Sequence, residues 1–308
     1  MVNKKIILTG ATGCVGVNFL KYLSERGIET TALVRPNSLR AETVRGIKNI
    51  KIIECDLSLL SVFESKERFD VFYHFGWEYT GKEFRNDSYR QNNNIAYTLD
   101  AVKLAANLGC KIFIGAGSQA EYGRVQDTIT PETPTNPDNA YGAAKLCAYK
   151  MSQIYANALG MKHIWARIFS IYGPYDSAET LISKAITMIL RHESPVLTEG
   201  EQQWDYLYGG DLARALYLIG EKGVSNSVYC IGSGQTRSIR DYMNILRDGI
   251  DPSVPLGFGK VPYSENQVMY LCADIDKLTK DTGFLPEVSF EEGIKRTIEW
   301  HRHRQNQN

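Results

Sequence analysis

A tyrosine and a lysine four residues apart form the most chemically suggestive pair in the sequence. The segment YGAAK, from Tyr141 to Lys145, falls within a predicted helix over residues 140–159. Positions i and i+4 share one helix face, so we expect the Lys145 ammonium beside the Tyr141 phenol. A neighbouring positive charge favours phenolate and lowers the pKa of a tyrosine. Such a pair is suited to exchanging a proton with a hydroxyl or a ketone, and a surface pair without chemistry is the alternative.

A glycine-rich segment, TGATGCVG at residues 9–16, lies between a predicted strand and a predicted helix. Gly10 permits a tight turn, Gly13 lets the backbone approach a pyrophosphate, and Gly16 lets the helix pack closely on the sheet. The helix N-terminus then presents N–H groups and a partial positive charge to phosphates. We predict a dinucleotide-binding loop, against the alternative of a turn that only relieves steric crowding. The residues expected at the cofactor are Gly10, Thr12, Gly13, Cys14, Val15 and Gly16.

The residues after the second predicted strand, Thr30–Val34, indicate which cofactor is bound. Proteins that bind NAD usually carry an acidic residue here, whereas those that bind NADP often carry an arginine for the 2′-phosphate. No acidic residue occurs between Thr30 and Arg40, and Arg35 follows the strand directly. Arg35, assisted by Ser38 and Arg40, is therefore predicted to hold the phosphate, which favours NADP over NAD. A solvated arginine beside a turn is the alternative.

Asp56 and Leu57 follow the third predicted strand, over residues 51–54. At this place an acidic side chain can reach the adenine amino group of a dinucleotide. Asp56 can also act as the N-cap of the next helix, and the two roles are compatible.

The elements around these residues alternate between strand and helix. Short apolar runs at 5–9, 30–34, 51–54, 71–75, 111–115 and 163–169 predict strands, and helical spacing separates them. This order predicts an α/β fold with a doubly wound parallel sheet and helices on both faces. Beyond residue 174 the alternation loosens into helices at about 178–191, 211–221, 238–248 and 289–303, and short strands near 205–208, 227–231 and 268–271.

Composition excludes several classes of protein. The chain has 308 residues, 43% hydrophobic and 23% charged, as in ordinary globular enzymes and unlike disordered or fibrous chains. Lys and Arg number 35 and so do Asp and Glu, so no basic excess points to nucleic acid. No apolar run approaches the roughly 20 residues of a membrane span, and Gly10 interrupts the N-terminal apolar run too early for a signal peptide. The six cysteines are widely spaced with no CxxC, which predicts free thiols in the cytoplasm and, with the scattered histidines, no metal site.

With these motifs the chain resembles the extended short-chain dehydrogenases/reductases, which include nucleotide-sugar epimerases, dehydratases and 4-ketoreductases. The resemblance extends over nearly the whole chain. Besides the glycine loop and the Tyr141–Lys145 pair it rests on IGAGSQAEYG at 114–123, HFG at 74–76, Asn94 with Thr98, RIFSIYGP at 167–174, GEQQWDYLYGGD at 200–211 and ADIDK at 273–277.

The resemblance implies a fold and a set of roles. It implies a Rossmann-type cofactor domain over residues 1–174 and a smaller α+β lobe over 175–308 that binds the nucleotide sugar, with some segments returning to the first domain. Ser118, Tyr141 and Lys145 correspond to the catalytic triad: Ser118 holds the substrate oxygen, Tyr141 passes the proton, and Lys145 tunes Tyr141 and grips the nicotinamide ribose. The positions that match further cofactor contacts are Phe75, Gly76, Asn94 and Ile168. The helices at 88–108 and 140–159 match those that commonly pair in a homodimer.

Departures from the family pattern narrow the expected activity. The family's 4,6-dehydratases carry an Asp-Glu pair after the Ser or Thr, whereas this chain has Gln119 and Ala120, which transfer no protons. The family often has Asn where Ser170 stands and an arginine where Trp204 stands. Trp204 could stack on a base or sugar instead.

Further candidate substrate contacts lie in two loops. Trp77 begins a segment that could cover the sugar, against the alternative of ordinary aromatic packing. Tyr263 and Gln267 lie in a segment that could touch the nucleotide. With Gln119, Ser170 and Trp204 they complete the predicted substrate residues.

The motifs SQAEYG and WDYL resemble those of the family branch that reduces 4-keto-6-deoxy sugars on a nucleotide carrier. We therefore expect an NADPH-dependent reductase of a dTDP-, CDP- or GDP-linked 4-ketohexose. A nucleotide-sugar 4-epimerase with tightly bound NAD is the closest alternative, and a non-catalytic NADP-binding sensor is an alternative of another class.

Overall fold

A parallel sheet forms the centre of the molecule in the computed structural model, which describes residues 4–305. Within these residues the sheet has seven strands in the order β10-β6-β5-β4-β1-β2-β3. Its strands are β1 (Ile6–Thr9), β2 (Thr30–Val34), β3 (Ile50–Glu54), β4 (Val71–His74), β5 (Ile112–Ser118), β6 (Lys162–Ile168) and β10 (Val228–Ile231). The predicted α/β doubly wound fold is confirmed. Residues 1–3, at the start of the apolar run considered above, lie outside the described residues.

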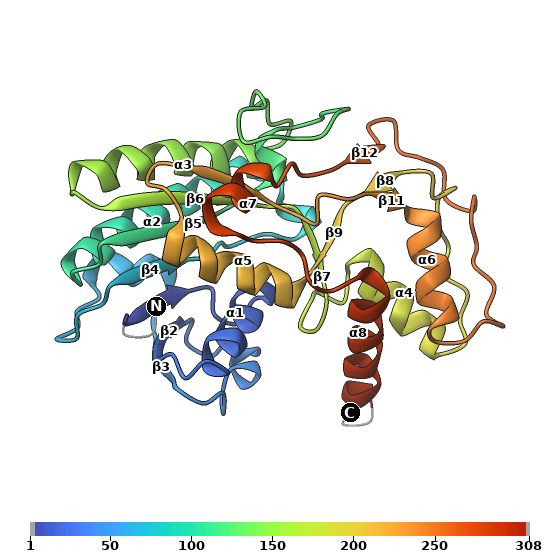
Figure 1. Cartoon of the computed structure of the whole chain (residues 1–308), viewed down its shortest axis with the longest axis horizontal. Coiled ribbons are helices and arrows are strands. Elements are labelled where there is room, and N and C mark those ends of the chain that lie inside the picture. The colour runs from blue at the N-terminus through green and yellow to red at the C-terminus, as the bar shows by residue number, and fades with distance from the viewer. Residues whose placement is uncertain (1–3, 306–308) are drawn as a thin grey trace.

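Helices cover both faces of this sheet (Figure 1). One face packs against α1 (Cys14–Ser24) and α5 (Gly209–Lys222), and the other against α2 (Ser88–Asn107) and α3 (Ala140–Ala158). Alternation along β1 explains the two layers, because Leu8 joins the core beneath α1 and α5 whereas Ile7 joins the core beneath α2. Every residue of β1 is buried, as expected for a central strand covered on both sides.

The second half of the chain adds smaller sheets and helices beside the main sheet. In Figure 1, α4 (Leu181–Leu190), α6 (Ile239–Asp248) and α8 (Phe290–Gln305) gather on the right, and α7 (Asp276–Thr282) lies near the main sheet. The small sheets contain β7 (Ser170–Tyr172), β8 (Gln203–Trp204), β9 (Tyr206–Tyr208), β11 (Arg237–Ser238) and β12 (Tyr270–Leu271). The 3-10 helices are η1 (Ala41–Thr43), η2 (Leu57–Val62), η3 (Lys82–Phe84) and η4 (Gln119–Glu121).

The strand order changes direction at β1, and this point determines where a ligand can bind. β1 pairs with β2 on one side and with β4 on the other. Strands β2 and β3 lie on one side of β1, whereas β4 and the strands that follow it in the sheet lie on the other side. In open α/β sheets, ligands bind at the carboxyl ends of the strands next to such a switch point. Most predicted strands and helices are found within a few residues of their expected bounds, whereas β7, β8, β11 and α7 were not predicted.

Between residues 4 and 305 no helix has the length and apolarity needed to span a membrane. In the same range no three His, Cys, Asp or Glu side chains gather as a metal site would require.

Candidate functional site

The glycine loop closes tightly over the end of β4. Gly10 has a φ of 73°, and a Cβ there would lie 2.5 Å from the backbone nitrogen of Gly76. A Cβ on Gly16 would lie 2.3 Å from the carbonyl oxygen of Gly10. Gly13 is the N-cap of α1 and offers no side chain to its N–H groups. This loop therefore has the close backbone approaches and the open helix N-terminus that a pyrophosphate needs, so the residues present fit a dinucleotide.

A cavity of about 480 Å³ opens beside this loop at the switch point. Many of the predicted cofactor and substrate residues line it: Gly10, Thr12, Gly13, Arg35, Ser38, Arg40, Asp56, Leu57, Phe75, Gly76 and Trp77. Its lining also includes residues that the sequence analysis did not assign: Ala11, Leu33, Val34, Cys55, Glu78, Tyr79, Thr80, Gly81 and Phe84. Glu78 and Tyr79 belong to the segment beginning at Trp77 that was expected to cover the sugar, and the structure places them in this cavity. The rest of the lining up to Phe84 could have been anticipated, because it follows β4 at the switch point.

Five predicted cofactor residues do not line this cavity. Cys14, Val15 and Gly16 lie in the first turn of α1, and the Cys14 thiol points toward the carbonyl of Pro174 at 3.8 Å. Burial raises the pKa of that thiol. Ile168 ends β6 and is nearly buried, opposite Ser118 in the register of β5 and β6.

Asn94 supports the cavity wall from behind. Its amide oxygen accepts a hydrogen bond from the Glu78 backbone at 2.7 Å, and its amide nitrogen donates to the Glu78 carbonyl at 3.2 Å. Asn94 is 1% exposed. Its position lets it act on a ligand through the Glu78 segment that it holds.

A buried chain of hydrogen bonds connects the glycine loop to this wall. The Gly76 N–H donates to Thr9 Oγ1 at 3.1 Å, and Thr9 Oγ1 lies 2.8 Å from His74 Nδ1. His74 Nε2 lies 3.2 Å from Thr98 Oγ1, which donates to the Asn94 carbonyl at 2.8 Å. Because Thr98 uses its proton on that carbonyl, it accepts from His74, and His74 is neutral with its proton on Nε2. Burial accordingly lowers the pKa of His74 to about 3.

The charged groups at the β2 end of the cavity include both signs. Arg35 is close enough to Glu78 to lower the pKa of that carboxyl, although burial, the largest effect, raises it. Asp56 accepts from the Ser58 N–H at 3.0 Å and is the N-cap of η2. The predicted capping role of Asp56 is confirmed, and its contact with adenine stays a prediction.

Ser118, Tyr141 and Lys145 come together where β5 ends and α3 begins. Ser118 Oγ donates to Gln119 Oε1 at 2.8 Å and also forms a hydrogen bond with the Tyr141 side chain. Asn139 caps α3 by accepting from the Gly142 N–H at 2.9 Å, which fixes the first turn that carries Tyr141. The three residues of the predicted triad thus share one location.

Lys145 is buried and makes two contacts. Its ammonium donates to the Ala116 carbonyl at 2.7 Å and lies 3.7 Å from the ring centroid of Trp77. Its distance to the ring centroid of Tyr141 is 5.9 Å. Burial lowers the pKa of Lys145 to about 7, and the negative charge of Glu121 acts in the opposite direction.

The predicted effect of Lys145 on Tyr141 is wrong in this structure. Burial raises the pKa of Tyr141, whereas the Ser118 hydrogen bond and the charge of Arg85 lower it by less. The i, i+4 spacing gave the correct neighbours, but Lys145 directs its ammonium to Ala116 and Trp77, and desolvation dominates. Tyr141 is therefore held as a neutral phenol, the form that donates a proton.

Trp77 stands between the cavity and the triad. Its ring meets Tyr141 edge-on, with centroids 6.0 Å apart, and its Nε1 donates to Gln91 Oε1 at 2.9 Å. Gln91 is fully buried and also bonds the carbonyls of Tyr79 and Phe84. Trp77 therefore belongs to the cavity wall, where it touches both Lys145 and Tyr141.

The remaining predicted substrate residues fall into two groups. Trp204 Nε1 donates to Ser170 Oγ at 2.8 Å, so these two residues lie together. Tyr263 instead bonds Glu201, accepting from its N–H at 3.1 Å, and Gln267 donates to the neighbouring Val268 carbonyl at 3.2 Å. The structure thus brings Ser170 and Trp204 together. Tyr263 and Gln267 form hydrogen bonds elsewhere, with Glu201 and with the Val268 carbonyl.

Two residues near the triad were not given a role from the sequence. Glu121 and Arg167 form an ion pair of 2.7 Å behind Ser118, with side chains 0% and 3% exposed. A carboxylate in the middle of the otherwise uncharged segment GAGSQAEYG was the available signal.

Comparison with known proteins identifies the family. The model of the NAD dependent epimerase/dehydratase family matches residues 6–232, and the chain belongs to this family. The description of this family as NAD dependent supports a nicotinamide cofactor for the chain.

Curated relatives are distant. A trifunctional UDP-glucose 4,6-dehydratase/UDP-4-keto-6-deoxy-D-glucose 3,5-epimerase/UDP-4-keto-L-rhamnose-reductase of Arabidopsis thaliana is 26% identical, over 97% of this chain and 47% of the plant protein. The chain thus spans about half the length of that relative. A dTDP-glucose 4,6-dehydratase of Escherichia coli is 29% identical over 56% of this chain and 50% of its own length.

Solved structures share the fold. The UDP-glucose 4-epimerase of Thermotoga maritima, solved with UDP-glucose, has a TM-score of 0.88 at 24% identity, covering 98% of this chain and 99% of that one. RMD from Pseudomonas aeruginosa, complexed with NADPH, has a TM-score of 0.82 at 22% identity, covering 97% and 100%. At these identities the likeness establishes the fold alone.

Proposed function

We propose that this chain is an NADPH-dependent reductase of a nucleotide-linked 4-keto-6-deoxyhexose. One observation carries the proposal. The side chains after Ser118 are Gln119 and Ala120, and the next carboxylate, Glu121, is turned away into its ion pair with Arg167. A second acid or base, which 4,6-dehydration would require on the hydroxymethyl side of the sugar, is missing from these positions.

The neutral Tyr141 supports reduction in particular. A reductase needs a donor for the oxygen that becomes a hydroxyl, and burial keeps Tyr141 protonated. Ser118 Oγ, now bonded to Gln119, would turn its hydrogen bond to the ketone oxygen. A reduced nicotinamide cofactor held by the glycine loop would supply the hydride for the carbonyl carbon. Such positioned acid catalysis contributes roughly 10²–10⁴-fold to rate.

The proposed cofactor preference depends on Arg35. Arg35, Ser38 and Arg40 all line the β2 end of the cavity, where a 2′-phosphate would lie. A guanidinium is well suited to a phosphate because it donates in a planar fork. The division into a cofactor part over 1–174 and a nucleotide-sugar part over 175–308 belongs to the same proposal, with dTDP, CDP or GDP as the carrier.

The test is NADPH oxidation by the purified protein with dTDP-, CDP- and GDP-linked 4-keto-6-deoxyhexoses, with NADH in parallel. We expect oxidation with one of these sugars and a preference for NADPH. Cofactor binding without turnover of any ketosugar or UDP-sugar would favour the non-catalytic sensor instead.

A nucleotide-sugar 4-epimerase is the second candidate, and Glu78 is the observation that favours it. Glu78 lines the cavity near Arg35 and could accept hydrogen bonds from the ribose hydroxyls, as the acidic residues of NAD-binding proteins do. An epimerase would release NAD on denaturation and interconvert UDP-sugars without net oxidation of cofactor.

We also propose a homodimer in the cytoplasm. Apolar side chains remain exposed on α2 and α3: Tyr89, Met151 and Ile154. Met151 and Ile154 are three residues apart on α3 and share one face, as a helix-to-helix contact between protomers requires. All six cysteines lie within residues 4–305 and are free thiols, which suits a reducing compartment. Light scattering on the purified protein tests the dimer.

A further inference from the structure

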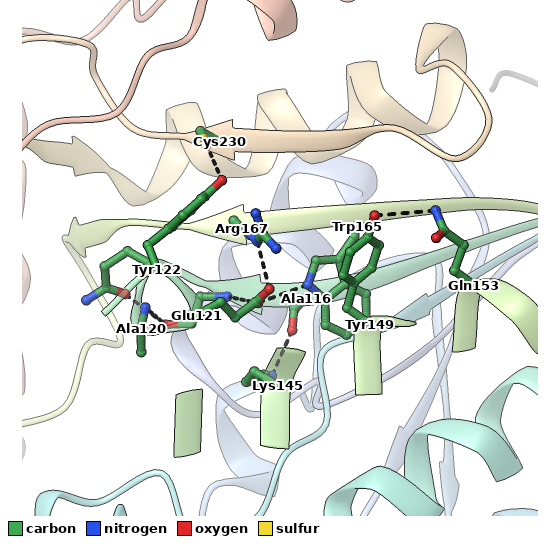
Figure 2. Close-up of polar contacts among 12 residues, drawn as sticks. Ala116, Ala120, Glu121, Tyr122, Lys145, Tyr149, Gln153, Trp165, Arg167 and Cys230 are labelled. Atoms are coloured by element: carbon green, nitrogen blue, oxygen red, sulfur yellow. Dashed lines mark hydrogen bonds and ion pairs between the residues drawn. The ribbon is translucent and has the colours of Figure 1, made fainter. Parts of the chain in front are cut away.

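A buried carboxylate lies directly behind Ser118. Glu121 is 0% exposed and its two oxygens receive three donors. Oε1 accepts from the Ser118 N–H at 2.8 Å and from Trp165 Nε1 at 2.9 Å, and Oε2 accepts from Arg167 Nε at 2.7 Å. Figure 2 shows the Glu121 side chain directed toward Arg167. Every contact of the carboxylate is thus charge-assisted or made to a fixed N–H group.

The surrounding strands leave room for this arrangement. A Cβ on Gly117 would lie 2.5 Å from Glu121 Oε1 and 2.3 Å from Trp165 Nε1. A Cβ on Gly115 would lie 2.2 Å from the Trp165 ring. The two glycines of β5 therefore create the hollow in which the carboxylate and the indole meet. The two glycines of the GAGS sequence therefore form part of β5 and also make room for the Glu121 carboxylate.

Arg167 is enclosed by aromatic rings. Its guanidinium carbon lies 4.3 Å from the ring centroid of Tyr122 and 5.5 Å from that of Tyr149. Tyr122 is held in turn by its hydroxyl, 3.2 Å from the Cys230 sulfur (Figure 2). A buried ion pair is often no more stabilising than apolar residues of the same volume. The presence of one here calls for a role other than stability.

The carboxylate is linked to each member of the triad. Glu121 and Ser118 form a reciprocal capping box around η4, which fixes the backbone that carries the Ser118 hydroxyl. Lys145 donates to the carbonyl of Ala116, two residues before Ser118 on the same strand. The negative charge of Glu121 also raises the pKa of both Lys145 and Tyr141.

We propose that Glu121 is a positioning residue of the active site, which fixes Ser118 at the end of β5 and places a buried negative charge directly behind the triad. It touches neither substrate nor cofactor and acts through those three residues. This inference rests on the proposed function, because it assigns Tyr141 the role of proton donor. Arg167 balances the charge of Glu121 on the side away from the triad.

Removal of this charge has a predictable sign. Without Glu121, the pKa of Lys145 and that of Tyr141 both fall, so both groups lose their protons at lower pH. The high-pH limb of the reductase profile therefore moves to lower pH. Other charged or titratable groups also act on these residues. Arg85 faces Tyr141, and His74 faces Lys145. Behind Glu121 lie Arg167, Tyr122 and Cys230.

The experiment compares two variants with a matched control. Glu121→Gln leaves a buried arginine without its counter-ion and is at risk of misfolding. The double variant Glu121→Gln/Arg167→Met removes both charges, retains an acceptor for the Ser118 N–H and carries the test. The control is Asp211→Asn, because Asp211 is another buried carboxylate that pairs with an arginine, Arg214, and accepts backbone N–H groups, at residues 287 and 288.

In the double variant we expect the high-pH limb to move to lower pH by a fraction of a pH unit, because the loss of the Arg167 positive charge partly offsets the loss of the Glu121 negative charge. The KM for NADPH should change less than twofold. Asp211→Asn should leave the limb in place, even where it lowers the melting temperature. The inference is overturned if the double variant has the same high-pH limb as the wild type. It is also overturned if the limb of Asp211→Asn shifts as far as that of the double variant.

A second readout does not depend on turnover. The titration of Lys145 is followed by the ¹³Cε resonance that disappears in Lys145→Met. The pKa of Lys145 should be lower in the double variant than in the wild type. If no ketosugar is reduced but this difference is observed, the proposed function fails while the electrostatic link stands. An active enzyme with an unchanged Lys145 titration refutes the role of Glu121 alone.

Discussion

The cofactor cavity and the region around Trp204 are built in different ways. The cavity is formed by short segments that each follow a strand of one sheet. The Trp204 region depends on two-residue strands, β8 between β11 and β12, and on side-chain contacts such as that between Trp204 and Ser170. The first is determined by local sequence, and the second by pairings between distant segments. Substitutions should therefore affect cofactor and substrate separately.

The largest expected effect is that of a substitution in the triad. Tyr141→Phe removes the phenolic proton while the ring can still pack against Trp77. We expect kcat to fall about 10³-fold, within the range for a positioned acid. The Kd for NADPH, measured by fluorescence titration, should change little. Full activity in this variant would refute the proposed donor.

A smaller effect, confined to the cofactor region, is expected from Gly10→Ala. Its positive φ costs about 1–3 kcal/mol for a residue with a side chain, and the added Cβ would press on the Gly76 backbone at 2.5 Å. Gly27→Ala is the matched control, since Gly27 has a φ of 67° with nothing within 4 Å of its Cβ. We expect both to lower the melting temperature and only Gly10→Ala to weaken NADPH binding. Equal Kd values in the two variants would contradict the role of the loop.

The preference between the two cofactors should depend on Arg35. In Arg35→Asp we expect the ratio of kcat/KM for NADPH to that for NADH to fall about 10–100-fold, since hydrogen bonds to charged groups contribute about 1.5–3 kcal/mol. Arg45→Asp is the control, because Arg45 is exposed and pairs with Glu42. An unchanged ratio in Arg35→Asp would remove Arg35 from the phosphate site and strengthen the case for NAD and Glu78.

The stability of the cofactor region should depend on pH through His74. Its pKa of about 3 lies below the value of an exposed histidine, so below about pH 6.5 the unfolded chain binds a proton that the folded chain does not. The free energy of unfolding therefore falls as the pH decreases from about 6.5, by roughly 2 kcal/mol at pH 5 from this residue. His74→Gln should flatten the profile in urea titrations between pH 5 and 7. An unaltered slope would show that His74 does not carry this proton linkage. Burial also lowers the pKa values of His163 and His301 to about 4, so these residues would retain part of the pH dependence of stability in His74→Gln.

The same difference between regions explains what could be predicted from the sequence. The sheet, its helices and the glycine loop were predicted because periodicity and glycine spacing act over a few residues. The i, i+4 spacing predicted that Lys145 lies near Tyr141 but not where its ammonium points, which depends on Trp77 and on the Ala116 carbonyl. Glu121 could not be assigned a role because its partner, Arg167, is 46 residues away on β6.

The smallest effect, and the one that sharpens the comparison most, concerns Trp204. Trp204→Phe retains an aromatic ring but removes the hydrogen bond to Ser170. If these residues contact the nucleotide sugar, the KM for the sugar should rise about 3–10-fold, as the loss of one hydrogen bond of roughly 1 kcal/mol implies, while the KM for NADPH stays constant. Ser170→Ala and the double variant complete a cycle in which the two single effects should not add, because both remove the same bond. A rise in the KM for NADPH instead would show that the Trp204 region and the cofactor cavity are coupled.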